Sequence, residues 1–266
     1  MFHLFTYCTN KEKVELLEKT TKIKNFPLTI LYEPQTEYKG YVSKIMKIKE
    51  VISTIPEKDI ICFVDAYDVL SFVNSEKEII DKFLSYQCDL LIGAEFNSYP
   101  YGYDDKYIPI ENNNTNFKYV NSGGYIGYQH ALNQLYHWKS DDEIIEICKN
   151  GGDQTYFIEY YLAHYSQKCQ LDYKQMIFQN MFLVSWYDFV VKEERVYNYV
   201  LDQYPCFMHF NGLSYQTDIN ENIMYAFVEK LENSISNPNE IYNFFNYKKS
   251  TWPNPTILSQ LIENKI

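Results

Sequence analysis

Two aspartates, Asp65 and Asp68, could together bind one metal ion. They follow an apolar run at residues 59–64 that is typical of a buried strand. Open α/β sheets bind ligands at the carboxyl ends of their strands. Hard divalent cations prefer carboxylate oxygens, and a nucleotide diphosphate can supply the remaining ones. The pair therefore predicts a cation site beside a nucleotide. The alternative is that Asp65 caps a turn and Asp68 lies in solvent, because aspartate is common in turns; the spacing leaves both open.

A glycine-rich segment at residues 119–128 is the second candidate. Asn121 and Ser122 precede the pair Gly123-Gly124. Paired glycines permit a positive φ or a close approach of the backbone to a ligand, and the two polar side chains could hydrogen-bond to sugar hydroxyls. A strand with a bulge would also favour glycine here. The spacing does not fit a GxGxxG loop, so a Rossmann dinucleotide cofactor is not supported.

Asp153 and His209 are weaker signals when each is taken alone. Asp153 follows Gly151-Gly152 just before a predicted helix, and aspartate is among the best N-cap residues. His209 lies in a short apolar run, where a histidine is more often structural than a ligand. Neither residue alone decides between a structural and a functional role.

Short apolar runs alternate with helix-period segments, and these elements must position the candidate residues. Strands alternating with helices imply right-handed crossovers and a mostly parallel central sheet, which is an α/β fold. Residues 95–118 are polar and contain prolines, so we expect a long surface loop that is functional or mobile. The predicted strands are residues 2–8, 28–32, 59–64, 89–94, 119–128 and 206–210, and the predicted helices are residues 11–24, 39–53, 76–86, 129–149, 154–164 and 218–231.

Domain organisation is less clear from the pattern. The periodicity blurs between residues 172 and 206, and no linker marks a boundary. We expect one α/β domain over residues 1–215 and a C-terminal helical extension, residues 216–266, packed on the same domain.

Composition narrows the class of protein. The chain has 266 residues, 46% of them hydrophobic, which suffices for a large core and argues against disorder. A net charge of -11 and one arginine, Arg195, argue against nucleic acid as a partner, because phosphate backbones are bound by clustered cations. We expect no membrane span, and residues 1–8 lack the basic start of a signal peptide, so a cytoplasmic location is the default expectation. The 6 scattered cysteines are expected to be buried free thiols.

Together, these segments resemble the glycosyltransferase domain of the collagen lysyl hydroxylases (the procollagen-lysine dioxygenase family) and, more distantly, procollagen galactosyltransferases. The resemblance runs from about residue 2 to about residue 213, with its blocks in the family's order. Blocks in the same order are far more specific than any one of them. They are the region from Gly40 to Lys49 with Lys44, residues 63–69, Ala94-Glu95 with Tyr99-Pro100, residues 121–127, Asp153-Gln154, residues 171–174 and 177–180, and His209-Phe210-Asn211-Gly212.

The resemblance implies a GT-A type (Rossmann-like) glycosyltransferase fold, a UDP-sugar donor and Mn²⁺. By position, Asp65 and Asp68 resemble the carboxylate ligands of the metal, and His209 resembles the third protein ligand. Tyr67 resembles the stacking partner of uracil, and Lys44 resembles a contact to the donor. A cation on the phosphates would stabilise the charge that develops on leaving UDP, and it would let an acidic protein bind an acidic nucleotide.

The resemblance also suggests which residues surround the transferred sugar. Asp153, Asn121 and Glu95 are the candidate catalytic residues, and Asp153 is the first candidate if a side chain assists the reaction. Asn121, Ser122 and Gly212 complete the predicted donor-binding set. The family reaction retains the anomeric configuration, and the sequence does not decide between a covalent intermediate and same-face attack.

Two departures from the family lie on the side expected to meet the sugar and the acceptor. The family's longer acidic run before Asp153 is replaced by Asn150-Gly151-Gly152, and a family tryptophan is matched by Tyr99. Both departures bear on the choice of acceptor more than on donor chemistry.

The resemblance therefore implies a metal-dependent transferase that moves glucose from UDP-glucose to galactosyl-hydroxylysine of a collagen-like polypeptide. The length leads us to expect a stand-alone transferase without the family's dioxygenase domains. One alternative is sugar transfer directly onto hydroxylysine, and another is a non-catalytic collagen- or glycan-binding module. The intact set of Asp65, Asp68 and His209 speaks against the module, since a binder need not keep a full ligand set.

Overall fold

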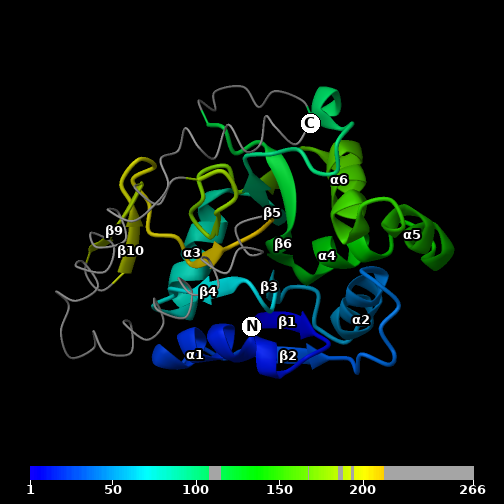
Figure 1. The fold of residues 1–266 in the computed structure, drawn as a ribbon, viewed down its shortest axis with the longest axis horizontal. Helices are drawn as coiled ribbons and strands as arrows, with labels where there is room; N and C mark the ends of the chain where they lie inside the picture. Colours follow the sequence, from blue (N-terminus) through cyan, green and yellow to red (C-terminus); the bar gives the residue numbers. More distant parts are fainter. Residues whose placement is uncertain (108–114, 167, 185–187, 193–194, 213–266) are drawn as a thin grey trace, which may run out of the picture.

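The computed structural model describes residues 1–107, 115–166, 168–184, 188–192 and 195–212 (Figure 1). Its centre is a 6-stranded sheet with the strand order β2-β1-β3-β6-β5-β7. β1 is parallel to β2 and β3, and β5 is parallel to β7, whereas β6 is antiparallel to β3 and β5. The predicted mostly parallel α/β sheet is confirmed, with β6 as the exception. The strands are β1 (Phe2–Cys8), β2 (Thr29–Tyr32), β3 (Ile60–Val64), β5 (Leu90–Glu95), β6 (Tyr119–Tyr128) and β7 (Cys169–Leu171).

Helices cover both faces of this sheet, because side chains along each strand alternate between two cores. In β3, Ile61 and Phe63 face a core shared with α2, α4, α5 and α6, whereas Cys62 and Val64 face a core shared with α1 and α3. All of β3 is buried, as predicted for a central strand covered on both faces. The helices are α1 (Glu15–Ile23), α2 (Val42–Ile52), α3 (Glu76–Ser85), α4 (Gln129–Tyr136), α5 (Asp141–Cys148) and α6 (Gly152–His164), with 3-10 turns η1 (Glu12–Val14) and η2 (Asp104–Lys106).

One predicted helix, residues 129–149, is wrong because the structure contains two helices, α4 and α5, in its place. Ser140 stands between them and forms a capping box with Glu143. The Ser140 hydroxyl accepts from the Glu143 N–H, and the Glu143 carboxylate accepts from the Ser140 N–H. A capping box satisfies the free N–H groups at a helix start, so it favours a new helix over a continuous one.

A second sheet joins three short strands in the order β4-β11-β8. β11 is antiparallel to β4 and parallel to β8, and it matches the predicted strand at residues 206–210. The other short strands carried no clear periodic signal in the sequence. The strands are β4 (Val69–Ser71), β8 (Phe178–Asn180) and β11 (Phe207–His209), and a separate hairpin contains β9 (Phe189–Lys192) and β10 (Arg195–Asn198).

Three further predictions concern the chain as a whole. The cysteines are all free and buried, as predicted. Within the described ranges, no helix combines the length and the hydropathy needed to cross a bilayer. The predicted helical extension, residues 216–266, lies outside the described residues, so the boundary after residue 215 stays a prediction.

Candidate active site

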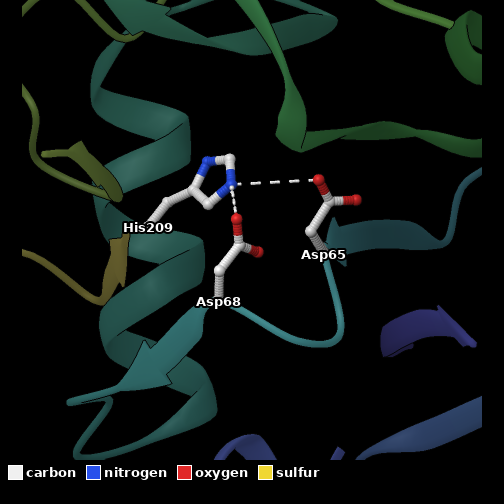
Figure 2. A group of neighbouring side chains, drawn as sticks. All are labelled: Asp65, Asp68 and His209. Carbon is white, nitrogen blue, oxygen red and sulfur yellow. Dashed lines mark hydrogen bonds and ion pairs between the residues drawn. The ribbon is translucent and has the colours of Figure 1, made fainter. Parts of the chain in front are cut away.

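Asp65, Asp68 and His209 come together at the end of β3 (Figure 2). One potential ligand atom from each residue lies within 4.8 Å of the other two. Nε2 of His209 is 3.2 Å from Oδ2 of Asp68 and 3.8 Å from Oδ2 of Asp65. The structure therefore assembles the three residues that the sequence suggested as metal ligands.

Strand pairing carries His209 to the aspartates. β4 begins directly after Asp68, and His209 pairs with Val69 in the antiparallel ladder of β4 and β11. The N–H of Phe210 donates to the carbonyl of Asp68 at 2.7 Å. Because these are backbone hydrogen bonds, the distance from His209 to Asp68 is set by the fold and not by flexible side chains.

Hydrogen bonds behind the ring determine the tautomer of His209. Nδ1 lies 2.9 Å from Oδ1 of Asn180 and 3.1 Å from Oδ1 of Asn121. Both amides are oriented independently of the ring. Oδ1 of Asn121 accepts from the Gly123 N–H, and Nδ2 of Asn180 donates to the Ala94 carbonyl. Nδ1 must therefore carry the proton, and the electron pair of Nε2 is directed at the two carboxylates.

An imidazole lone pair that faces two carboxylates needs a cation between them. One candidate is a proton: burial lowers the pKa of His209, but the facing Asp68 and Asp65 outweigh burial, so the pKa is raised. The other is a divalent metal, because carboxylate oxygens with a neutral imidazole suit ions such as Mn²⁺. The donor set, the tautomer and the geometry thus fit the divalent ion that the sequence suggested.

Gly123 leaves the space that the His209 ring occupies. A Cβ at residue 123 would lie 2.2 Å from Cε1 of His209 and 2.8 Å from Oδ2 of Asp65. The β5–β6 ladder also shifts register between Ile92 and Gly93, opposite this segment. The alternative of an irregular strand is confirmed. The group that lies against Gly123 is the chain's own histidine, and the approach of this backbone to a ligand stays a prediction.

Lys44 connects the candidate metal-ligand cluster, Asp65, Asp68 and His209, to Asp153. Its Nζ is 2.9 Å from Oδ1 of Asp65 and 2.5 Å from Oδ2 of Asp153. The side chains of Lys44 and Asp153 are only 12% and 8% exposed. Burial alone would lower the pKa of Lys44, but Asp153 and Asp65 outweigh it, so the pKa is raised and the lysine is charged. Asp65 thus gives one oxygen to Lys44 and turns the other toward His209.

Asp153 is not the N-cap of α6, so the N-cap alternative for this residue is wrong. Gly151 occupies the cap position with φ of 120°, and Gly152 follows with φ of 74°. These positive φ angles start the helix before Asp153, which lies in the first turn and makes no cap hydrogen bond. The buried carboxylate is therefore free to act on a neighbouring group, and in this structure the neighbour is Lys44.

Glu95 is a buried carboxylate held by side-chain amides. Nε2 of Gln154 donates to Oε1 at 2.7 Å, and Nδ2 of Asn211 donates to Oε2 at 2.8 Å. Burial raises the pKa of Glu95 to about 7, although the hydrogen bonds from Gln154, Asn121 and Asn211 act to lower it. The group is therefore balanced between its two protonation states near neutral pH, which suits a residue that handles a proton.

Other residues predicted to contact the donor lie around this cluster. Tyr67 lies in the loop between the two aspartates, and its hydroxyl accepts from the Thr9 N–H at 2.8 Å. The N–H of Ser122 donates to Oε1 of Gln154 at 3.3 Å. Gly212 has a positive φ of 66° close to the end of the described chain. Their contacts with a nucleotide, and that of Asn121 with a sugar, stay predictions.

Sequence reasoning gave no individual role to three amides that organise the site. Gln154 connects Glu95 with Ser122, Asn180 orients His209, and Asn211 donates to Glu95. All three amides lie within the blocks that carried the family resemblance, which was their only signal. No spacing rule identifies an amide that acts on a side chain brought to it by strand pairing.

The mixed α/β sheet with an acidic cluster at the end of its central strand is the architecture of a GT-A type fold. The crystal structure of an active-site mutant of LgtC shares this fold with a TM-score of 0.51 at 12% sequence identity. The match covers 80% of this chain and 88% of that one. The fold class predicted from the sequence is confirmed.

The chain belongs to the PLOD glycosyltransferase (GT) domain family, whose model matches residues 4–233. It is 29% identical over 181 residues to the uncharacterized protein R699 of Acanthamoeba polyphaga mimivirus, covering 65% of this chain and 36% of that protein. It is 30% identical over 185 residues to the human multifunctional procollagen lysine hydroxylase and glycosyltransferase LH3, covering 65% of this chain and 23% of LH3. The chain thus spans a minor part of the length of these relatives.

Proposed function

We propose that this chain is a Mn²⁺-dependent glucosyltransferase that transfers glucose from UDP-glucose to galactosyl-hydroxylysine in collagen or a collagen-like protein. Family membership supports the transfer of a sugar, and the similarity to LH3, a procollagen lysine hydroxylase and glycosyltransferase, supports a procollagen-like acceptor. The observation that carries the metal-dependent part is the directed lone pair of His209, which faces Asp65 and Asp68.

In this proposal, each residue of the candidate active site has a distinct role. Asp65, Asp68 and His209 would hold the metal, which when bound offsets the negative charge that develops on the leaving diphosphate. Lys44 keeps the Asp65 carboxylate turned toward that position and holds Asp153 at the first turn of α6. Asp153 is the candidate that would lie beside the transferred sugar.

Glu95 provides a second buried acid on the opposite side of Asn121. The side-chain amide of Asn121 hydrogen-bonds to both His209 and Glu95, so it connects the candidate metal ligands with the Glu95 carboxylate. With its pKa near 7, Glu95 can accept or return a proton without a large energetic cost. This role for Glu95 is part of the proposal.

A UDP-release assay tests the function. The protein is incubated with Mn²⁺ and, in turn, UDP-glucose, UDP-galactose and other UDP-sugars, with a galactosyl-hydroxylysine peptide, a hydroxylysine peptide or no acceptor. We expect the fastest UDP release from UDP-glucose with the galactosylated peptide, and its loss in excess EDTA. Preference for the unglycosylated peptide would indicate direct transfer to hydroxylysine. Acceptor binding without any UDP release would indicate a binding module.

Matched variants make the assay specific for the site. Asp68→Asn should remove the activity because it deletes a proposed ligand charge. Asp59→Asn is the control, because Asp59 pairs with the N-terminal amine and His3 away from the cluster. Full activity in excess EDTA, or in Asp68→Asn, would overturn the metal-dependent mechanism.

A further inference from the structure

Gln175 is a fully buried amide in the turn between β7 and β8. Its exposed fraction is 0%, and its φ of 54° lies in the left-handed region, which residues other than glycine adopt mainly where their surroundings require it. The N–H of Gln175 donates to the carbonyl of Asp172 at 2.9 Å and closes the turn. This turn directs the Gln175 side chain back onto β8, where it contacts Asn180.

Two side chains of this turn satisfy the outer edge of β8, which is the last strand of the β4-β11-β8 sheet in the described part of the chain. Oδ2 of Asp172 accepts from the Phe178 N–H at 2.7 Å, and Oε1 of Gln175 accepts from the Asn180 N–H at 2.8 Å. Buried N–H groups need an acceptor, so these two bonds determine where the backbone of β8 lies. Asn180, at the end of β8, is the residue whose amide orients His209.

Gln175 also holds the acceptor of the Asn180 side chain. Nε2 of Gln175 and Nδ2 of Asn180 both donate to the carbonyl of Ala94, at 2.9 Å and 2.8 Å. Nε2 of Gln175 has a second acceptor, the carbonyl of Asp172, at 2.9 Å. Because Oε1 faces an N–H and Nε2 faces two carbonyls, only one orientation of the Gln175 amide satisfies its partners. Gln175 therefore fixes Asn180 both at its backbone and at the acceptor of its side chain.

One further hydrogen bond connects this amide pair with the candidate metal ligands. Oδ1 of Asn180 accepts from Nδ1 of His209 at 2.9 Å, and the two residues are partners in the β8–β11 ladder. A hydrogen bond weakens as its distance and angle depart from the optimum, so a loosened β8 would hold the His209 ring less firmly. Asn121 also accepts from Nδ1, at 3.1 Å, so the loss would be partial.

We propose that Gln175 is a positioning residue, which keeps Nε2 of His209 directed at the two aspartates by fixing Asn180. The proposal rests on the proposed function where it invokes Mn²⁺. The orientation of the His209 ring, in contrast, is a property of the metal-free protein and is measured there. Gln175 thus extends the set of side chains that orient His209 from Asn121 and Asn180 to a residue in the turn before β8.

Exchange of the His209 Nδ1–H with water tests this role in the metal-free protein. Nδ1 carries its proton in both the neutral and the charged ring, so the signal does not depend on the charge of His209. The N–H signal is recorded by NMR on protein with isotope-labelled histidine and assigned with His209→Gln. Gln175→Met keeps the length of the side chain without its amide. We expect its Nδ1–H to exchange about tenfold faster than in the wild type, because the ring leaves its acceptors more often.

Mn²⁺ affinity and a double-mutant cycle test whether Gln175 acts through Asn180. Gln175→Met should weaken Mn²⁺ binding about fivefold, less than Asn180→Ala does, because Asn121 still accepts from the ring. In the Asn180→Ala background, the same substitution should change the Mn²⁺ affinity less than about twofold, since residues that act through one another are not additive. Fully additive effects would overturn the proposal that Gln175 acts through Asn180.

Gln129→Met is the matched control. Gln129 is 5% exposed, its Nε2 donates to the Ile52 carbonyl at 2.9 Å, and its N–H donates to the carbonyl of Asp59, before the start of β3 and thus at the opposite end of that strand from Asp65. Gln129→Met should lose stability but keep the exchange rate and the Mn²⁺ affinity of the wild type.

Gln175→Asn is the milder variant, because asparagine tolerates a positive φ and its amide is one carbon shorter. It should also raise the exchange rate, and it replaces Gln175→Met if that variant does not fold. Exchange and Mn²⁺ affinity equal to those of the wild type would overturn the positioning role. If the wild type binds no Mn²⁺, the proposed metal-dependent function is wrong, and the exchange rates still test the role of Gln175.

Discussion

Asn180 and His209 lie opposite each other in the parallel ladder of β8 and β11, and Oδ1 of Asn180 is 2.9 Å from Nδ1 of His209. The ladder register places the amide directly behind the ring. Because Nδ1 must donate to this amide, Nε2 is left as the atom that could bind the proposed metal. A strand pair without any acidic residue therefore decides which nitrogen of His209 can bind a metal.

Asn180→Ala should weaken Mn²⁺ binding by about tenfold or more, the usual effect of removing a group that orients a metal-bound histidine. The Mn²⁺ affinity is measured by titration, with free Mn²⁺ detected by electron paramagnetic resonance. Asn133→Ala on α4, remote from the cluster, is the control and should bind Mn²⁺ like the wild type. An unchanged Mn²⁺ affinity in Asn180→Ala would contradict the role of Asn180 in orienting His209 for metal binding.

Gly123→Ala should abolish Mn²⁺-dependent UDP binding, because its Cβ would overlap the His209 ring. Gly127→Ala is the control on the same strand. Its Cβ would lie 2.8 Å from the carbonyl of Asp89, so it should destabilise β6 without touching the ligands. Calorimetry with UDP and Mn²⁺ and a thermal melt are recorded for both. If Gly123→Ala binds UDP as well as Gly127→Ala does, the proposed arrangement of ligands is wrong.

Asp153→Asn should lower kcat strongly and change the Kd for UDP little, since an interaction with the reacting sugar would be lost mainly in the transition state. The ion pair with Lys44 also disappears, so we expect a loss of stability of about 1–3 kcal/mol. Steady-state kinetics and denaturant unfolding separate the two effects. A kcat close to that of the wild type would show that Asp153 serves only to hold Lys44.

Protonation of Glu78 in acid should make the protein less stable. Burial would raise its pKa, but Lys82 and Arg195 outweigh burial, so the pKa is lowered in the folded state. A lowered pKa contributes stability above the unfolded-state pKa, and this contribution is lost as the pH falls through the folded-state value. Glu78→Gln should cost about 3 kcal/mol near neutral pH, because two buried cations lose their shared partner.

The measurement is denaturant unfolding of the wild type and Glu78→Gln from pH about 3 to about 7, the range over which carboxylates titrate. The difference in stability should shrink as the pH falls. Glu76→Gln in the first turn of the same helix is the exposed control and should follow the wild type. A difference that stays constant with pH would indicate that lost packing, and not charge, explains the effect.

The sequence predicted the sheet, most helices and the three proposed ligands because their signals are local. Asp65 and Asp68 follow a strand that is apolar throughout, and that strand is buried as expected. The family blocks supplied His209, whose own surroundings favoured a structural role. Its meeting with Asp68 depends on the pairing of β4 with β11, and strands this short leave no periodic pattern to recognise.

The relationships between predicted residues were harder to foresee than the residues themselves. Lys44 and Asp153 were each singled out, but their ion pair depends on how α2 packs beside the start of α6. The N-cap alternative for Asp153 failed because Gly151 and Gly152 both adopt positive φ angles, which composition permits but does not require. The break between α4 and α5 was missed although the sequence signals it: residues 139–143 are all polar, and Ser140 with Glu143 three residues later is a capping-box pattern that starts a new helix.

The order in which the chain is synthesised gives the β4–β11 pairing a further consequence. Asp68 and His209 are 141 positions apart, so the ribosome makes both aspartates long before the histidine. At typical elongation rates this delay is roughly 10–30 s, during which a nascent chain holds the acidic pair without its nitrogen ligand. Such a chain can bind a divalent ion only weakly through the aspartates. The completed site therefore arises in one late step, when the segment containing β11 has emerged from the ribosome and can pair with β4.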